Sequence, residues 1–319
     1  MKTTKINFIC PLCKSNLHLK ENSYLCSNDE CPHSCKEEAF HIINSKPIFY
    51  SNHLDSVMIE KKTSPYVTRG KSFFQPMQKL KTDKTRNFLY GNLLKTKKNL
   101  ELFVTNLNKL SPNPKVLIIG SGTRGNGTSF LYETKNLEIY GQDIYGSENV
   151  DFISDAHYLP LASEQFDGIL IQAVLEHVVE PTKVVSEIYR LLKDNGVIYA
   201  ETPFMQQVHE GAYDFNRYSV LGHRYLFKKF EMLKMGGLGG SEVVLTWAVK
   251  YFIWSVFRIR ILAKLIGFIF SILLRPFSFL ISKSSMHDSS SGTFFLGIKK
   301  KGFALSQMEL IKLYKGNIS

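Results

Sequence analysis

The stretch Val116-Leu-Ile-Ile-Gly120-Ser-Gly122-Thr-Arg-Gly125 decides the fold of this chain. Its four apolar residues predict a buried strand, its glycines predict a tight turn, and the residues that follow, up to Glu133, predict a helix. Glycine lets the backbone turn sharply and approach a ligand closely, because it has no Cβ atom. The motif alone fits a dinucleotide as well as other adenosine-containing cofactors.

The residues around this stretch alternate between short apolar runs and helical patterns, as in a parallel α/β sheet. Helices are predicted at about 181–192 and 219–229. The predicted strands are KVLIIG (115–120), LEIYGQD (137–143), VDFISD (150–155), DGILIQA (167–173), GVIYAETP (196–203) and TFFLGIKK (293–300). The predicted fold class is therefore α/β.

Polar residues at the ends of the predicted strands point to one ligand site. Asp143 ends the second strand, 23 residues after Gly120, where a carboxylate suits a ribose diol. Asp155 ends the third strand and Gln172 the fourth. The carboxyl ends of parallel strands meet at one edge, so these side chains are expected to lie close together. The alternative is that Asp143 and Asp155 are ordinary turn residues.

A wider set of motifs resembles the class I S-adenosylmethionine-dependent methyltransferases, type 11-like, over about residues 115–240. These motifs are Gly120-x-Gly122, Asp143, Asp155-Ala-x-x-Leu-Pro, Phe166-Asp167 and Leu-Glu176-His177-Val. The resemblance implies a Rossmann-like sheet with S-adenosylmethionine as cofactor. It implies that the methionine end of the cofactor lies at Gly120, Ser121, Gly122 and Gln172, its ribose at Asp143, and its adenine at Ile144, Asp155 and Ala156.

One position departs from the family pattern. The family usually has an acidic residue two positions before the first glycine, and this chain has Ile118 there. Loss of a carboxylate near the methionine amino group would weaken cofactor binding. This keeps open the alternative of a non-catalytic scaffold with a methyltransferase fold.

All five cysteines lie within residues 10–35, and no secretory signal precedes them, which favours a metal site in a reducing cytoplasm. The stretch resembles the zinc ribbon that precedes many bacterial methyltransferases. Spacing favours a structural zinc ion held by Cys10, Cys13, Cys26 and Cys31. The fourth ligand stays open, because His33 and Cys35 lie close to Cys31 in sequence.

The segment after the fifth strand, Thr202 to Ser219, is rich in polar side chains. It resembles the His-x-x-x-Tyr-Asp-Phe-x-Arg-Phe-Thr stretch of methyltransferases from glycan and polysaccharide pathways. His209 is the predicted general base, with Asp214 as the alternative, since the ordinary pKa of histidine suits that task. Tyr213 and Arg217 are predicted to bind the acceptor. Alternatively, Tyr213, Asp214 and Arg217 form a structural corner between the loop and the next helix.

The chain has a net charge of +12, distributed as +9 over 1–110, −6 over 111–242 and +9 over 243–319. Residues 243–287 contain no Asp or Glu and are mostly apolar. Their longest uncharged run, Leu265–Leu274, is shorter than the roughly 18–20 residues that span a bilayer. Projected as one helix, the segment places Lys250, Arg260, Lys264 and Arg275 on one face. This predicts an amphipathic helix at a membrane surface through 250–283; packing inside the protein or in a dimer is the alternative.

These patterns divide the chain into five regions: a zinc ribbon (1–50), a helical linker (51–110), the methyltransferase core (111–242), an apolar basic amphipathic insertion (243–287) and a final strand with a tail (288–319). The expected activity is methyl transfer to an oxygen of a glycan, a lipid-linked sugar or a similar small acceptor. The absence of an Asn/Asp-Pro-Pro-Tyr motif after the fourth strand argues against amino-group acceptors. We expect a cytoplasmic protein at the inner membrane face. The alternative is an RNA methyltransferase whose ribbon and Lys-rich linker bind phosphates.

Overall fold

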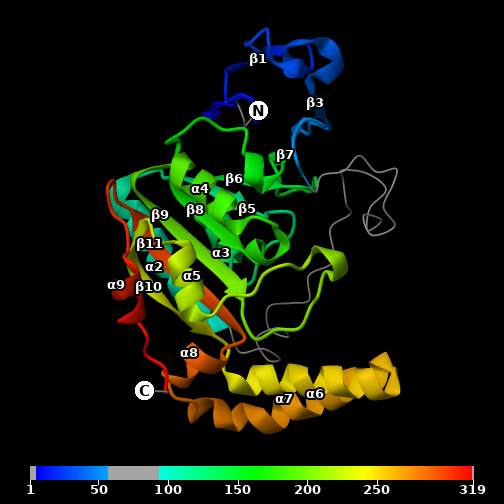
Figure 1. The fold of residues 1–319 in the computed structure, drawn as a ribbon, viewed down its shortest axis with the longest axis vertical. Coiled ribbons are helices and arrows are strands. Elements are labelled where there is room, and N and C mark those ends of the chain that lie inside the picture. The colour runs from blue at the N-terminus through cyan, green and yellow to red at the C-terminus, as the bar shows by residue number, and fades with distance from the viewer. Residues whose placement is uncertain (1–4, 57–92, 318–319) are drawn as a thin grey trace.

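The computed structural model of the chain describes residues 5–56 and 93–317. Over these residues, eleven strands form one sheet in the order β1-β2-β3-β4-β7-β6-β5-β8-β9-β11-β10 (Figure 1). The strands are β1 (Leu17–Lys20), β2 (Ser23–Cys26), β3 (Phe40–Ile43), β4 (Lys46–Phe49), β5 (Lys115–Ile119), β6 (Glu138–Asp143), β7 (Phe152–Ser154), β8 (Phe166–Gln172), β9 (Leu192–Pro203), β10 (Phe230–Leu238) and β11 (Gly292–Lys299).

Five parallel strands, in the order β7-β6-β5-β8-β9, form the centre of the sheet and confirm the α/β prediction. Ile118 of β5 lies beside Gly141 of β6 on one side and Leu170 of β8 on the other. The chain proceeds outward from β5 through β6 to β7, and then outward in the other direction from β8 to β9. Ligands of such sheets bind at the carboxyl ends of the strands, next to this reversal.

The sheet ends in an antiparallel pair that the sequence predicts only in part. The predicted final strand is β11, which lies between β9 and β10 and runs antiparallel to each. No pattern predicted β10, because its apolar residues do not alternate regularly and it has a bulge between Met232 and Lys234. Strand β9 starts at Leu192, before the predicted start at Gly196, and the preceding helix ends at Leu191, close to its predicted end.

Helices cover the two faces of the sheet. On one face, α2 (Leu93–Leu110) completely buries Leu100, Phe103 and Leu107 against β5 and β8. Helix α2 therefore shares an apolar cluster with β5 and β8, and the predicted boundary at residue 111 falls between elements that pack together. The rest of the predicted linker, over 57–92, lies outside the described residues.

The other face is covered by α4 (Pro181–Leu191) and α5 (Val220–Leu226). Val184, Ile188 and Leu191 recur at helical spacing on α4 and are fully buried, as the sequence predicted. Ser219 caps α5 by accepting a hydrogen bond from the backbone N–H of Gly222. A short helix, α3 (Ser129–Glu133), follows the glycine turn.

The cysteine-rich module continues the central sheet. Strand β4 runs parallel to β7, with Ile48 beside Ile153. Phe8 and Phe49 pack on each other with ring centroids 4.8 Å apart, and Phe8 also contacts Phe152 of the core at 5.4 Å. The described part of the predicted ribbon, residues 5–50, therefore shares one hydrophobic core with the sheet.

Residues 241–289 form a helical hairpin instead of one helix. Helix α6 (Ser241–Phe257) and helix α7 (Arg260–Leu274) are joined at Arg258, which adopts a left-handed backbone conformation with φ of 57°. A 3-10 turn (Arg275–Phe279) and α8 (Ser285–Ser289) follow. The projection of Lys250 and Arg260 onto one helical face is wrong, because the chain reverses between them.

The hairpin projects from the end of the sheet opposite the cysteine-rich module (Figure 1). Many of its large apolar side chains are exposed, among them Ile261 at 80%, Phe279 at 89% and Leu280 at 78%. Arg260–Phe279 is the one stretch within 5–56 and 93–317 that is long and apolar enough to cross a membrane, judged by length and composition alone. Only 11% of its most apolar window is buried.

Candidate active site

The turn after β5 contains glycines whose surroundings leave no room for a side chain. Gly120 has a φ of 79°, and a Cβ atom on it would lie 2.2 Å from Cγ2 of Val174. A Cβ atom on Gly125 would lie 1.8 Å from Oε1 of Gln172. The turn therefore lies tightly against the end of β8, as the predicted cofactor turn requires.

Gln142, a residue that the sequence analysis did not single out, connects three strand ends. Its carbonyl oxygen accepts hydrogen bonds from the N–H groups of Gly120 and Ser121 at 2.9 and 3.0 Å, and its amide donates to the Ser154 carbonyl. The Ser121 hydroxyl also donates to Gln142 and is buried, so Ser121 shapes the turn rather than presenting its side chain to a ligand.

Asp143 lies where the sequence predicted it, at the carboxyl end of β6. One carboxylate oxygen accepts a 2.8 Å hydrogen bond from the N–H of Gly122, and the other accepts one from Tyr145 at 3.2 Å. Burial raises the pKa of Asp143, although these N–H groups act to lower it. Ile144 packs beside it on a small apolar cluster that includes Ile153.

Asp155 follows β7 at the same edge, and its side chain is engaged locally. It accepts hydrogen bonds from the N–H of His157 at 2.8 Å and from Nδ1 of His157 at 2.6 Å, and Ser56 donates to its second oxygen. Burial acts to raise the pKa of Asp155, but the hydrogen bonds from His157 outweigh it and lower the pKa. Asp155 therefore caps a turn, as the structural alternative proposed, and Ala156 is buried beside it.

A buried carboxyl group that the sequence did not reveal lies beside Gln172. Glu201 of β9 accepts hydrogen bonds from the Gln172 amide at 2.5 Å and from the Thr96 hydroxyl of α2 at 2.7 Å. It lies beside Gln172 in register. Ile118, the departure from the family pattern, packs in the apolar cluster under α2. Glu201 therefore supplies a carboxyl group near the carboxyl ends of the strands. Position 118, where the family usually has an acidic residue, supplies none.

Two buried acceptor atoms beside the glycine turn fit the ammonium group of a bound S-adenosylmethionine. Oε1 of Gln172 and Oδ1 of Asn126 have no hydrogen-bond partner among the described residues. Such unpaired buried acceptors cost stability unless a ligand or water donates to them. Ammonium is a donor only, so the chemistry of this end of the site matches the cofactor that the motifs imply.

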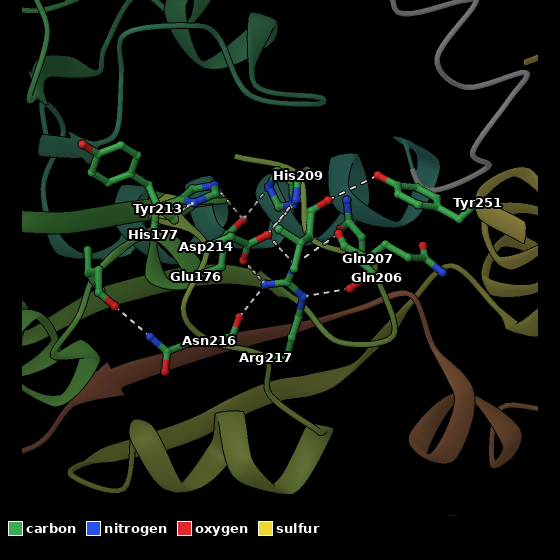
Figure 2. Close-up of polar contacts among 12 residues, drawn as sticks. Glu176, His177, Gln206, Gln207, His209, Tyr213, Asp214, Asn216, Arg217 and Tyr251 are labelled. Atoms are coloured by element: carbon green, nitrogen blue, oxygen red, sulfur yellow. Dashed lines mark hydrogen bonds and ion pairs between the residues drawn. The ribbon is translucent and has the colours of Figure 1, made fainter. Parts of the chain in front are cut away.

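The loop between β9 and α5 brings the predicted acceptor residues together (Figure 2). The Asp214 carboxylate accepts bonds from Arg217, including one of 2.6 Å, and a 2.8 Å bond from the N–H of His209. Burial acts to raise the pKa of Asp214, but the bonds from Arg217 and His209 outweigh it and lower the pKa to about 2. Asp214 is therefore too weak a base to take a proton near neutral pH.

Arg217 and Tyr213 form hydrogen bonds that hold the loop in place. The Arg217 guanidinium also donates to the backbone carbonyls of Gln206 and Gln207, at 3.0 and 3.3 Å. The Tyr213 carbonyl accepts a 2.6 Å bond from Nδ1 of His177, while its ring extends away from Asp214 (Figure 2). This is the structural corner that the sequence analysis left open as the alternative to acceptor binding.

His209 is held by Asp214 and remains partly exposed. Its Nδ1 atom lies 3.1 Å from an Asp214 oxygen, and a proton on Nδ1 would leave Nε2 free to accept a proton. Burial and the neighbouring His177 lower the pKa of His209, although Asp214 acts to raise it. Of the two predicted bases, His209 alone has the geometry for the role.

Glu176 and His177, from the turn after β8, lie against this loop. The Glu176 carboxyl group is almost completely buried, and burial raises its pKa to about 8. Its backbone carbonyl accepts hydrogen bonds from the N–H groups of Phe215 and Asn216, at 2.7 and 3.2 Å. These bonds fix the acceptor loop to the end of β8.

Four cysteine sulfurs converge in the N-terminal module. Sγ of Cys10 lies 3.7 Å from that of Cys31, and Sγ of Cys13 lies 3.4 Å from that of Cys26. All four lie within 4.8 Å of one another. Sulfurs bound at about 2.3 Å to one zinc ion lie about 3.8 Å apart, so the cluster is compatible with a zinc ribbon.

The two alternative fourth ligands point elsewhere. The Cys35 thiol is exposed and donates to the Pro32 carbonyl at 3.2 Å. His33 is buried, with Nδ1 at 2.6 Å from the Glu38 carbonyl and Nε2 at 2.8 Å from the Ser51 hydroxyl. Both ring nitrogens of His33 are thus occupied, which leaves Cys31 as the fourth member of the cluster.

Comparisons with known proteins find a family match for the central part of the chain. Residues 118–200 match the family model described as "Methyltransferase domain". A comparison with curated proteins found no match.

Solved structures with a similar fold include three methyltransferases. A putative sarcosine dimethylglycine methyltransferase from Galdieria sulphuraria is 16% identical, with a TM-score of 0.44, over 65% of this chain and 86% of that one. Phosphoethanolamine N-methyltransferase 2 from Haemonchus contortus is 15% identical, with a TM-score of 0.39, over 63% of this chain and 53% of that one. Geranyl diphosphate C-methyltransferase from Streptomyces coelicolor A3(2) is 11% identical, with a TM-score of 0.42, over 63% of this chain and 75% of that one.

At these identities the structural neighbours say nothing about the acceptor. The family match rests on the glycine turn and the strands that the sequence itself singled out. Residues 118–200 are similar to a methyltransferase domain, and the five parallel strands around them resemble the Rossmann-like sheet of class I methyltransferases.

Proposed function

We propose that the protein transfers a methyl group from S-adenosylmethionine to a hydroxyl oxygen of a lipid-linked sugar or glycan, at the cytoplasmic face of a membrane. The observation that carries the proposal is the position of the exposed apolar hairpin. Helix α6 follows β10, whose last residue, Leu238, lies beside Gly292 of β11, itself beside Pro203 at the carboxyl end of β9. The hairpin therefore starts beside the carboxyl ends of the central strands, where the cofactor turn also lies.

A direct contact joins the hairpin to the acceptor loop. The Tyr251 hydroxyl of α6 donates a 3.2 Å hydrogen bond to the carbonyl of Val208, the residue before His209 (Figure 2). A surface that held α6 against lipid would thus hold His209 close to the same lipid. An acceptor carried on a lipid would meet the loop without leaving the membrane.

The composition of the hairpin suits a lipid surface. Its apolar side chains are exposed, and residues 243–287 contain basic but no acidic side chains. Helices with exposed Phe, Leu and Ile and nearby Lys and Arg bind the interface of anionic membranes. The four-cysteine cluster fits the reducing conditions of the cytoplasm.

The loop has the chemistry that methylation of a hydroxyl group needs. S-adenosylmethionine supplies an electrophilic methyl group on a positively charged sulfur. The acceptor oxygen attacks the methyl carbon, the carbon–sulfur bond breaks, and the hydroxyl proton passes to Nε2 of His209. Asp214 holds the ring in the required orientation through Nδ1.

The proposal is tested by labelling acceptors in a membrane extract. Purified protein and S-adenosylmethionine with a deuterated methyl group are incubated with the extract, and lipid-linked sugars are analysed by mass spectrometry. We expect one labelled methyl group on a sugar-containing lipid, and at least tenfold less label with His209→Ala. Label in RNA, or in no lipid-linked species, would overturn the proposed acceptor.

A further inference from the structure

Three metal-ligating side chains meet at the edge of the acceptor loop. Nε2 of His177 and Nε2 of His209 each lie 3.8 Å from Oε1 of Glu176. The two imidazole rings are 4.8 Å apart between centroids and nearly perpendicular. One ligand atom of each residue lies within 4.8 Å of the others. This cluster is separate from the four cysteines.

Both histidines are oriented from behind. Nδ1 of His177 donates to the Tyr213 carbonyl at 2.6 Å, and Nδ1 of His209 lies 3.1 Å from an oxygen of Asp214. With Nδ1 protonated, each ring directs an Nε2 lone pair toward the Glu176 carboxyl group (Figure 2). Histidine ligands of metal ions are held in this way by a carbonyl or carboxylate on the second nitrogen.

The Glu176 carboxyl group lacks a partner for one of its oxygens. Its side chain is 1% exposed, and Oε2 has no hydrogen-bond partner among the described residues. Two nitrogen lone pairs and a buried carboxyl group therefore face one another, and none of the described side chains places a positive charge between them. A divalent cation would satisfy all three.

We propose that Glu176, His177 and His209 bind a divalent transition-metal ion that holds the acceptor oxygen. Two histidines and one carboxylate, with further positions open, form a set that suits manganese, iron, cobalt or zinc. Donors at about 2.1 Å from one ion lie roughly 3 to 3.4 Å apart, so the 3.8 Å separations need only small side-chain rotations.

The inference rests on the proposed methylation of a hydroxyl group and changes how its proton is lost. Bound to the ion, the acceptor hydroxyl would release its proton to water more readily, because the ion stabilises the alkoxide. The alkoxide would then attack the methyl carbon, and the carbon–sulfur bond would break as before. His209 would then promote loss of the proton as a ligand of the ion, and it would not accept the proton itself.

Manganese is the suitable probe, because thiolate clusters select softer ions and the four cysteines are occupied when the protein is loaded with zinc. Full-length protein loaded with a single zinc ion per chain, which the four cysteines bind first, is titrated with Mn²⁺, and the free ion is followed by electron paramagnetic resonance. We expect one Mn²⁺ per chain. Glu176→Gln and His209→Ala should each weaken binding at least tenfold, whereas His18→Ala, at an exposed histidine of β1, should bind as the unchanged chain does.

Binding of S-adenosylmethionine is measured on the same samples to show that each variant is folded. Absence of Mn²⁺ binding at millimolar concentration, or unchanged binding by folded Glu176→Gln and His209→Ala, would overturn the metal site. The assay contains no acceptor, so its outcome is independent of the proposed acceptor. Metal binding without labelling of lipid-linked sugars would retain the site and reject that acceptor.

Discussion

At the scale of single residues, hydrogen bonds decide which of the predicted side chains can do chemistry. Asp214 and His209 were alternatives for the same role in the sequence. Arg217 and the N–H of His209 stabilise the Asp214 carboxylate, while His209 keeps an accessible Nε2. No sequence pattern shows how two groups share a proton, because that depends on contacts made only after folding.

Asp143 gives a residue-scale prediction. Asp143→Ala removes the carboxylate that holds Gly122 and that would accept the ribose hydroxyls. We expect affinity for S-adenosylmethionine to fall at least tenfold, which corresponds to about 1.4 kcal/mol and to the loss of one charge-assisted hydrogen bond. Calorimetry measures it, with Asp194→Ala, at an exposed aspartate of β9, as the control. Equal affinities of the two variants would remove Asp143 from the cofactor site.

His209 gives a prediction on pH. Nε2 of His209 must be deprotonated both to act as a general base and to bind a metal ion, and burial together with His177 lowers the pKa of His209. The acidic limb of the pH–rate profile should therefore lie below the ordinary histidine value of about 6.5. His209→Gln should abolish that limb along with most of the rate. An acidic limb that stays in place in this variant would show that another group titrates.

At the scale of elements, the sequence predicts what local patterns determine. The strand and glycine turn around Gly120 follow from consecutive residues, and the structure confirms them, whereas the predicted helix is confirmed only over Ser129–Glu133. The reversal at Arg258 could not be predicted, since a left-handed arginine within an apolar run has no sequence signal. The meeting of Glu176 with His209 could not be predicted either, because it depends on two backbone bonds across the sheet edge.

The zinc ribbon gives an element-scale prediction. Freshly reduced protein should contain one zinc ion per chain, measured by elemental analysis. Cys31→Ser should lose most of it and Cys35→Ser should keep it, since only the Cys31 sulfur joins the cluster. The module shares a core with β7, so removal of zinc should also lower the unfolding temperature of the whole protein. Retention of zinc by Cys31→Ser would return the fourth ligand to His33 or Cys35.

At the scale of the whole molecule, the cysteine module and the α6–α7 hairpin lie at opposite ends of one sheet (Figure 1). The module extends the sheet at the β7 edge by strand pairing. The hairpin leaves its apolar side chains exposed, which is unusual for a protein that acts alone in water. Under the proposed function, the hairpin end of the molecule is the one that contacts the membrane.

The last prediction is that anionic vesicles bind the protein through the hairpin. Ile261→Glu and Phe279→Glu change two of its most exposed apolar side chains, and Leu19→Glu makes the same change at the opposite end, on β1. Burying one such side chain is worth about 1.5–3 kcal/mol, so the double hairpin variant should lose at least tenfold in vesicle binding while Leu19→Glu keeps it. Co-sedimentation with phosphatidylglycerol vesicles measures this, and added salt should weaken binding, because the hairpin is basic. If the unchanged protein stays in the supernatant and forms dimers that the hairpin variant does not form, the hairpin is a subunit interface and the membrane proposal fails.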